Sequence, residues 1–263
     1  MRVINRRTLL FVAVGFLTLG ILASCATTPE LSSPETPEAT AISLEGPLEL
    51  YEILYVSALG NSLHTVSADG SREATLLARD EFDGCVGGTI TSHTWSSDGS
   101  AFAASVHLRT DTGERLEAVY VGREGSTEIR PVFTSPEVSP FYLYWNPATE
   151  ELSLIGGDGS GALFLYIVDA ASGEARLAHR GTRSLYWTWS DDGETMVTHT
   201  GGSLQDGQGT LRVHRRGDGG FEPEVVIGQE RSAGRFQVPD VTNGGRIAVS
   251  LTNPVGGNTV AVL

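Results

Sequence analysis

Two segments of the sequence are copies of one pattern: HTWSSDGSAFAAS (His93–Ser105) and WTWSDDGETMVTH (Trp187–His199). In each of them Trp-Ser-x-Asp-Gly is followed by a short apolar run. Asp-Gly is typical of a tight turn, because glycine adopts a positive φ at little cost. Two further segments, YWNPATEELSLIG (Tyr144–Gly156) and PDVTNGGRIAVSL (Pro239–Leu251), are weaker copies. The pattern predicts a turn that leads into a buried strand, repeated along the chain.

A second repeat lies between these copies. ILYVSALGNSLHTVSADGSREATLLA (Ile53–Ala78) aligns with LSLIGGDGSGALFLYIVDAASGEARLA (Leu152–Ala178), and each reads as three short strands separated by glycine-containing turns. No long stretch after Leu48 shows a helical period. Equivalent positions of the first pattern are 50, 44 and 52 residues apart, at Trp95, Trp145, Trp189 and Val241. Four strands per repeat at this spacing predict the blades of an all-β propeller.

The Trp-Ser-x-Asp-Gly pattern, with a later strand that ends near Asp-x-x-(Ser/Gly)-Gly, resembles the WD-repeat-like unit of TolB-like β-propellers. The resemblance covers residues 49–263. It is firm at Trp95–Gly99 and Trp189–Gly193 and loose at Trp145–Pro147, where Asp-Gly is missing, and at Val241–Gly244. It implies that a bulky tryptophan packs between neighbouring blades, so we expect the tryptophan of each copy to be a core residue.

Three complete repeats and two partial ones predict about five four-stranded blades. The first unit lacks its Trp-bearing strand, and the last stops at NTVAVL (Asn258–Leu263), inside what reads as its third strand. TolB-like propellers more often have six or more blades, so we expect a C-terminally truncated propeller. The alternative is that the last unit pairs with Ile53–Ala78 and closes a small ring.

The first 24 residues read as a lipoprotein signal peptide. Three arginines precede an apolar run, Thr8–Ala23, which is shorter than the roughly 20 residues of a transmembrane helix. The run ends in Leu-Ala-Ser24-Cys25, which resembles the bacterial lipobox. The resemblance implies cleavage between Ser24 and Cys25 and lipidation of Cys25, including fatty acylation of the palmitate type. The alternative is an ordinary secreted protein with a chance cysteine.

Residues 25–46 are rich in Pro, Thr, Ser and Glu, which predicts a flexible tether between the lipid and a propeller at 47–263. The anchor predicts an extracytoplasmic, membrane-attached protein. Ala26, rather than Asp, favours the outer membrane in an organism with two membranes; otherwise we expect the outer face of the cell membrane. The pair Arg6-Arg7 leaves both general-secretory and twin-arginine export open.

Charge and cysteine content limit the partners. Without the three leader arginines the chain has 15 basic and 32 acidic residues, a formal charge of −17. Such a surface repels phosphate backbones, so we expect no nucleic-acid partner, and the membrane link must be the covalent lipid. Once Cys25 is lipidated only Cys85 remains, so the mature domain holds no internal disulfide.

The sequence shows no catalytic constellation. There is no Gly-x-Ser-x-Gly, the Gly-rich loop FDGCVGG gives Cys85 no activating base, and Gly156–Gly161 links two strands rather than a strand and a helix. The six histidines lack metal-ligand spacing, so we expect no catalytic residue, metal or cofactor. Trp187 is the candidate ligand-binding residue: it shares a strand face with Trp189 but has no counterpart in the other repeats.

The leading hypothesis is a non-catalytic, lipid-anchored platform that binds a protein, peptide or glycan of the cell envelope. One alternative is the propeller portion of a truncated prolyl-oligopeptidase-like peptidase. Another is a small-molecule- or sugar-binding propeller that uses Trp187 and the central channel.

Overall fold

The computed structural model describes residues 52–78, 82, 85–123, 126, 128–181, 184–201, 208–217, 220–231, 238–252 and 258–262. The predicted signal peptide (1–24), its cleavage site at Ser24 and Cys25, and the predicted tether (25–46) lie outside the described residues. All described strands belong to one compact unit, Leu44–Leu263. Within the described part of the chain, no helix has the length and apolar character needed to cross a membrane.

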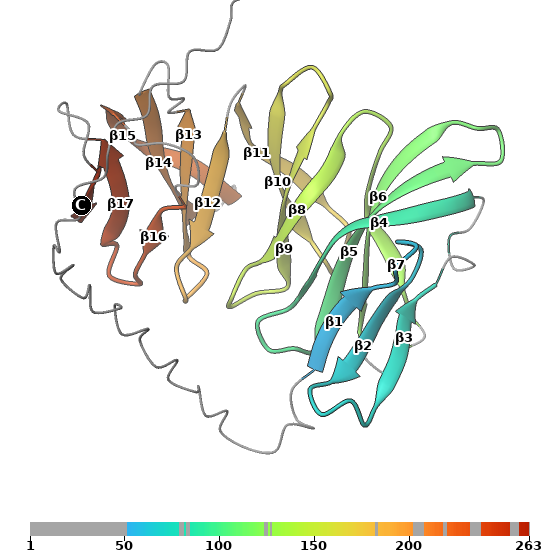
Figure 1. Ribbon diagram of the computed structural model, residues 1–263. Coiled ribbons are helices and arrows are strands. Elements are labelled where there is room, and N and C mark those ends of the chain that lie inside the picture. The colour runs from blue at the N-terminus through green and yellow to red at the C-terminus, as the bar shows by residue number, and fades with distance from the viewer. Residues whose placement is uncertain are drawn as a thin grey trace, which may run out of the picture. The chain divides into compact units, whose positions relative to one another are not determined.

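The described residues form 18 strands in chain order (Figure 1). They are β1 (Glu52–Val56), β2 (Leu63–Ser67), β3 (Glu73–Leu77), β4 (Cys85–Trp95), β5 (Ala101–Thr110), β6 (Arg115–Arg123), β7 (Arg130–Ser135), β8 (Ser139–Trp145), β9 (Glu151–Gly157), β10 (Leu163–Asp169), β11 (Ala175–Gly181), β12 (Leu185–Trp189), β13 (Thr195–Gly201), β14 (Gln208–Gly217), β15 (Gly220–Arg231), β16 (Asp240–Val241), β17 (Ile247–Thr252) and β18 (Asn258–Val262).

These strands make five antiparallel sheets, each a simple meander. The three middle sheets have four strands (β4–β7, β8–β11 and β12–β15), whereas the first (β1–β3) and last (β16–β18) have three. The prediction of an all-β fold with about five antiparallel sheets is confirmed. β1 and β18 belong to different sheets, so the described strands do not pair the last unit with the first.

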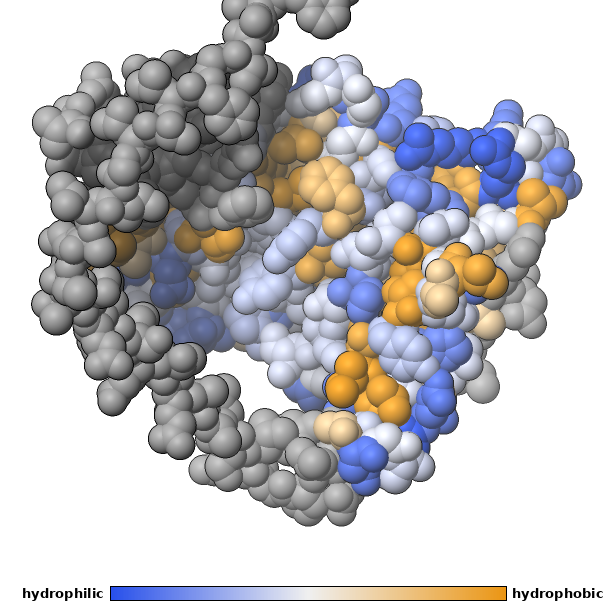
Figure 2. All heavy atoms as spheres, viewed as in Figure 1, coloured by the Kyte–Doolittle hydropathy of each residue, from blue (hydrophilic) through white to orange (hydrophobic). Residues whose placement is uncertain are grey.

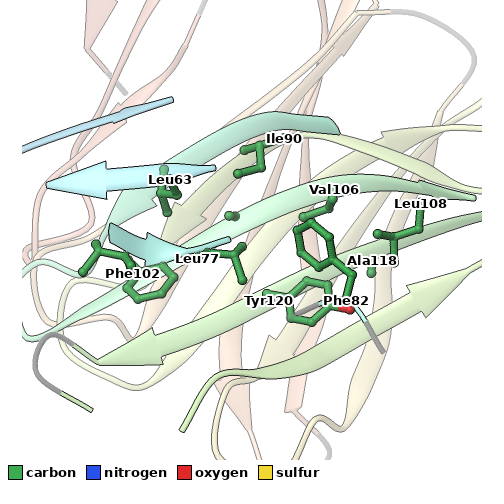
Figure 3. Packing of buried hydrophobic residues seen from close by; sticks show 11 residues of the cluster. Leu63, Leu77, Phe82, Ile90, Phe102, Val106, Leu108, Ala118 and Tyr120 are labelled. Carbon is green, nitrogen blue, oxygen red and sulfur yellow. The ribbon is translucent and has the colours of Figure 1, made fainter. Parts of the chain in front are cut away.

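Neighbouring sheets bury a shared core between them, because alternate residues of a strand point to opposite faces. In the run AFAAS of β5, Phe102 and Ala104 join a core with the first sheet, whereas Ala101 and Ala103 join a core with the third. Figure 3 shows Leu63 and Leu77 of the first sheet close to Phe102 of the second. Two further cores lie between the third and fourth sheets and between the fourth and fifth. Each sheet is therefore stabilised by its neighbours in the chain.

The Trp-Ser-x-Asp-Gly segments form the tight turns that the sequence predicts. Gly99 and Gly193 have φ values of +71° and +69°. In the first turn, Asp98 accepts hydrogen bonds from the Ser96 hydroxyl (2.7 Å) and from the backbone and hydroxyl of Ser100. These donors stabilise the carboxylate and lower the pKa of Asp98 to about 2. The sequence motif is therefore a self-contained hydrogen-bonded turn.

The loose copy at Trp145–Pro147 also forms a hydrogen-bonded turn, with Asn146 in the role that aspartate has in the firm copies. Asn146 accepts the backbone N–H of Ala148 at 3.0 Å, as the aspartate does elsewhere. Its amide also donates to the Gly193 carbonyl at 3.1 Å, and this links the turns of the third and fourth sheets. A Cβ at position 193 would overlap Asn146 Oδ1, so Gly193 is required both by its φ and by this contact.

One local prediction was wrong. The sequence FDGCVGG predicts a Gly-rich loop around Cys85, but Cys85–Gly88 are the first residues of β4, which pairs with the end of β5. Glycine at position 88 leaves room for the Phe82 ring, because a Cβ there would lie 2.7 Å from that ring. Cys85 is a free, half-buried thiol, and burial followed by the charge of Asp111 raises its pKa.

Candidate functional site

The candidate ligand residue Trp187 lies beneath the surface. Its side chain is 7% exposed, and its indole N–H donates to the Ser153 hydroxyl at 2.8 Å. Trp189 donates to the same oxygen at 3.1 Å, which confirms that both rings share one strand face. Ser153 in turn donates to the Tyr144 carbonyl at 2.6 Å. The two tryptophans are thus held on β9 through one fully buried hydroxyl that the sequence did not single out.

Aromatic side chains that are exposed lie over Trp187. Tyr142 and Tyr144 meet its ring edge to face, with centroids 5.4 and 6.4 Å away. Together with Phe141 they form what we call the aromatic strip of β8 (Phe141, Tyr142, Tyr144), whose members are 50%, 57% and 41% exposed. Burial, followed by the charges of Tyr142, Asp191 and Asp240, raises the pKa of Tyr144. The strip therefore offers flat apolar faces in an acidic setting.

The turns of the second and third sheets enclose a cleft of about 490 Å³, which we call the loop-face cleft. It is lined mainly by hydroxyl, amide and charged groups. Arg130 donates to the carbonyls of Ala170 and Ala171, and Arg123 forms an ion pair with Glu150. The Arg130 guanidinium is thus held against backbone carbonyls, whereas the Arg123–Glu150 pair is exposed.

Trp145 lines the same cleft and is 4% exposed. Its indole N–H is buried and has no hydrogen-bond partner among the described residues. Buried donors of this kind are rare in folded proteins, because an unsatisfied group costs about 1–3 kcal/mol. The wall of the cleft therefore includes a buried donor that no described acceptor satisfies. The sequence predicted Trp145 as a core residue and gave no sign that its N–H lacks an acceptor.

Among the described residues that line the loop-face cleft there is neither histidine nor cysteine, and the hydroxyl groups of Ser96 and Ser100 donate to Asp98. Within the described part of the chain, no three His, Cys, Asp or Glu side chains are grouped as metal ligands. The arrangement can hold a polar ligand by hydrogen bonds and ion pairs. Ser24 and Cys25, the predicted processing and lipidation residues, are outside the described part.

No protein-family model matches the sequence, and no curated protein matches it. Among solved structures, the β-propeller domain of the Trilobed protease from Pyrococcus furiosus superposes with a TM-score of 0.51 and 13% identity, over 81% of this chain and 64% of that one. An oligogalacturonate lyase in complex with manganese gives a TM-score of 0.50 and 16% identity, over 76% and 53%. TolB from Acinetobacter baumannii gives 0.49 and 14%, over 82% and 51%.

The chain spans between 51% and 64% of the length of these three structures. At such low sequence identity the likeness concerns the fold alone, and the assignment rests on the first two structures. The antiparallel sheets of this chain match those of β-propeller domains, so the described part of the chain has a β-propeller fold.

Proposed function

We propose that this chain is a lipid-anchored, extracytoplasmic propeller that binds a protein, peptide or glycan of the cell envelope without transforming it. The observation that carries the binding role is the loop-face cleft itself, a hollow of about 490 Å³ whose lining includes hydroxyl, amide and guanidinium groups. Concave sites with a few fixed polar groups are where proteins bind ligands. The anchor rests on the sequence before Cys25.

The composition of the cleft favours a neutral, polar ligand. Its two arginines are already paired, with the Ala170 and Ala171 carbonyls or with Glu150, so they orient a ligand more than they attract charge. Hydroxyl groups of Ser96, Ser100 and Thr149 add donors and acceptors. A glycan or an extended peptide presents the matching hydroxyls and amides at short intervals. These are the two ligand classes that the cleft suits.

Labelled full-length protein in detergent, applied to arrays of glycans and of short peptides, tests the binding role. Arg130→Gln removes a guanidinium group that lines the cleft, so it should weaken binding about 10-fold, as the loss of one hydrogen bond from a charged donor does. Arg180→Gln is the matched control, because Arg180 is an exposed arginine that does not line the cleft. Equal effects of both substitutions, or no ligand on either array, contradict the proposal.

The same purified protein, incubated with fluorogenic peptides, tests the non-catalytic part. We expect no hydrolysis above a buffer blank. Turnover that co-purifies with the chain and follows its concentration would instead support the peptidase alternative.

Labelling cells with radioactive palmitate tests the anchor. Cys25→Ala should abolish incorporation and leave the protein unprocessed or released. Cys85→Ala is the control and should be labelled normally. Membrane retention of the Cys25→Ala protein with normal maturation would show that the anchor is wrongly assigned.

A further inference from the structure

A second cleft, of about 660 Å³, lies at the other end of β5 and β6. The loop-face cleft is lined by Ala101 at the start of β5 and by the end of β6, whereas this cleft is lined by the end of β5 and by Arg115 at the start of β6. It also contacts the β1–β2 turn and the first residues of β4.

The charge of this cleft is opposite to that of the chain. The whole chain has a formal charge of −14, yet Arg109 and Arg115 line the cleft beside His107, and its described lining contains no carboxylate. Asp111 and Glu114 belong to the β5–β6 turn and are not among the lining residues. Figure 2 shows strongly hydrophilic side chains gathered over the β5–β6 hairpin. Two guanidinium groups in an acidic protein mark a place where an anion is favoured.

A buried carboxylate organises one side of the cleft. Glu117 is 2% exposed and contacts both His107 Nδ1 and Arg115 Nε. The Ser139 hydroxyl also donates to Glu117, at 3.3 Å, and Arg115 donates to Ser139 at 3.4 Å. Glu117 therefore fixes the positions of His107 and Arg115 while it neutralises one positive charge. The carboxylate is buried, whereas the Arg115 and His107 side chains are 63% and 36% exposed, so both remain accessible from the cleft.

Arg109 supplies the charge that Glu117 does not neutralise. Among the described residues its guanidinium donates to the Gly113 carbonyl at 3.2 Å, and it forms no ion pair with them. A guanidinium group held by one neutral acceptor keeps further N–H groups for a carboxylate, which it binds through two parallel hydrogen bonds. Arg109 is the group that would meet an anionic ligand.

Apolar side chains complete the cleft. Leu59 is 83% exposed and Val86 is 54% exposed, and both line it. Part of the wall is backbone, because Gly87 and Gly88 carry no side chain. A ligand that satisfies all of these groups has a carboxylate on one side and an apolar group next to it.

We propose that this cleft, which we call the carboxylate cleft, binds an anionic ligand in which a carboxylate adjoins an apolar group, as at the C-terminus of a peptide. A single carboxylate suits the one unneutralised arginine, whereas a polyanion is repelled by the rest of the surface. The site is separate from the loop-face cleft and does not depend on the proposed function.

Calorimetric titration of the full-length protein in detergent tests this, with N-acetyl-leucine as the probe. The two compounds N-acetyl-leucine and N-acetyl-leucinamide differ only in the carboxylate. We expect the acid to bind with a Kd on the order of 1 mM, as suits so small a ligand, and the amide at least tenfold more weakly. Equal binding of acid and amide overturns the carboxylate assignment, and tighter binding of inorganic phosphate overturns the ligand class.

Variants locate the site. Arg109→Gln should weaken the binding of N-acetyl-leucine at least tenfold, because it removes the unneutralised guanidinium. Arg180→Gln is the matched control: it removes the same charge from an exposed arginine that lines neither cleft and should leave the affinity unchanged. If Arg109→Gln alters folding, as judged by its far-UV circular dichroism, Arg115→Lys keeps the charge but loses the fork, and should weaken binding as well. Unchanged affinity in a folded Arg109 or Arg115 variant contradicts the proposal.

Discussion

At the scale of single residues, one hydroxyl holds the interface between the third and fourth sheets. Ser153 accepts hydrogen bonds from two indole groups and donates one to a backbone carbonyl, all from a fully buried position. Because its partners come from two neighbouring sheets, it joins them by direct polar contacts inside an apolar core. The loss of this hydroxyl leaves the Trp187 N–H without its acceptor.

Ser153→Ala should therefore lower the free energy of unfolding by about 2–4 kcal/mol, since buried polar groups left unsatisfied cost about 1–3 kcal/mol each. Urea denaturation followed by tryptophan fluorescence measures the change. Ser160→Ala, in an exposed turn, is the control and should cost less than about 1 kcal/mol. A loss at Ser153 no larger than the loss at Ser160 would show that the two indoles find other acceptors.

Gly193 gives a second prediction at this scale. Gly193→Ala introduces a side chain at a φ of +69° and into the space of Asn146, so we expect a loss of about 2–4 kcal/mol. Gly70→Ala is the matched control, since Gly70 has a φ of +75° with nothing near its absent Cβ, and should cost only about 1–2 kcal/mol. Equal losses in urea denaturation would show that the backbone alone requires glycine at position 193.

The sequence predicted hydrogen-bonded turns, whose partners are close in the chain, but it did not predict the contacts between sheets. Trp-Ser-x-Asp-Gly predicts its turn because Asp98 bonds to residues two positions away. The acceptor of the Trp187 N–H, by contrast, is 34 residues distant, and the partner of Gly193 is 47 residues distant. No local spacing encodes such pairs. For the same reason the sequence indicated Trp187 but neither the tyrosines over it nor the unpartnered N–H of Trp145.

At the scale of elements, β14 places a titratable group inside the fold. His214 is fully buried, with Nε2 2.9 Å from the Thr198 hydroxyl of β13. Burial, followed by the charges of His179 and Arg212, lowers the pKa of His214 to about 4. In the unfolded chain a histidine has a pKa of about 6.5. Between these values the unfolded chain binds a proton that the folded one does not.

The stability that His214 contributes as a neutral group is therefore complete above about pH 6.5 and is lost as the pH falls towards 4. The loss attributable to His214 should be on the order of 3 kcal/mol at most, and smaller if the site admits water. Urea denaturation at intervals from pH 7 to 4.5 measures it. His214→Gln, which keeps a hydrogen-bonding group near Thr198, should flatten the curve. Parallel curves for the variant and the parent would assign the pH dependence to other groups.

Element boundaries were less predictable than element types. The repeats predicted which runs are strands. These runs are rich in apolar residues because a neighbouring sheet packs on each face of the strand. The start of β4 was missed because Gly87 and Gly88 read as a loop. Their conformation is imposed by pairing with Leu108 and Arg109 of β5 and by the Phe82 ring. Tertiary contacts override the local preference at this point.

At the scale of the whole molecule, stability comes from the shared cores rather than from covalent bridges. The chain has two cysteines, and Cys85 is a free thiol. We expect a reducing agent to leave the melting temperature of the monomeric Cys25→Ala protein unchanged, because its single thiol has no partner within the chain. Differential scanning calorimetry with and without reductant checks this. A shift of several degrees in strictly monomeric protein would be incompatible with this cysteine assignment.

The two clefts at opposite ends of β5 and β6 have a consequence for assembly. A strand of 10 residues such as β5 spans about 30 Å, so ligands seated at its two ends would not touch. With both proposed sites, the chain can hold two components that are linked to each other. Once one of them is bound, the linker keeps the other near its cleft at a high effective concentration, and avidity rises without any new contact. Short, stiff spacers between two such components would lose this gain, because they cannot reach around the sheet.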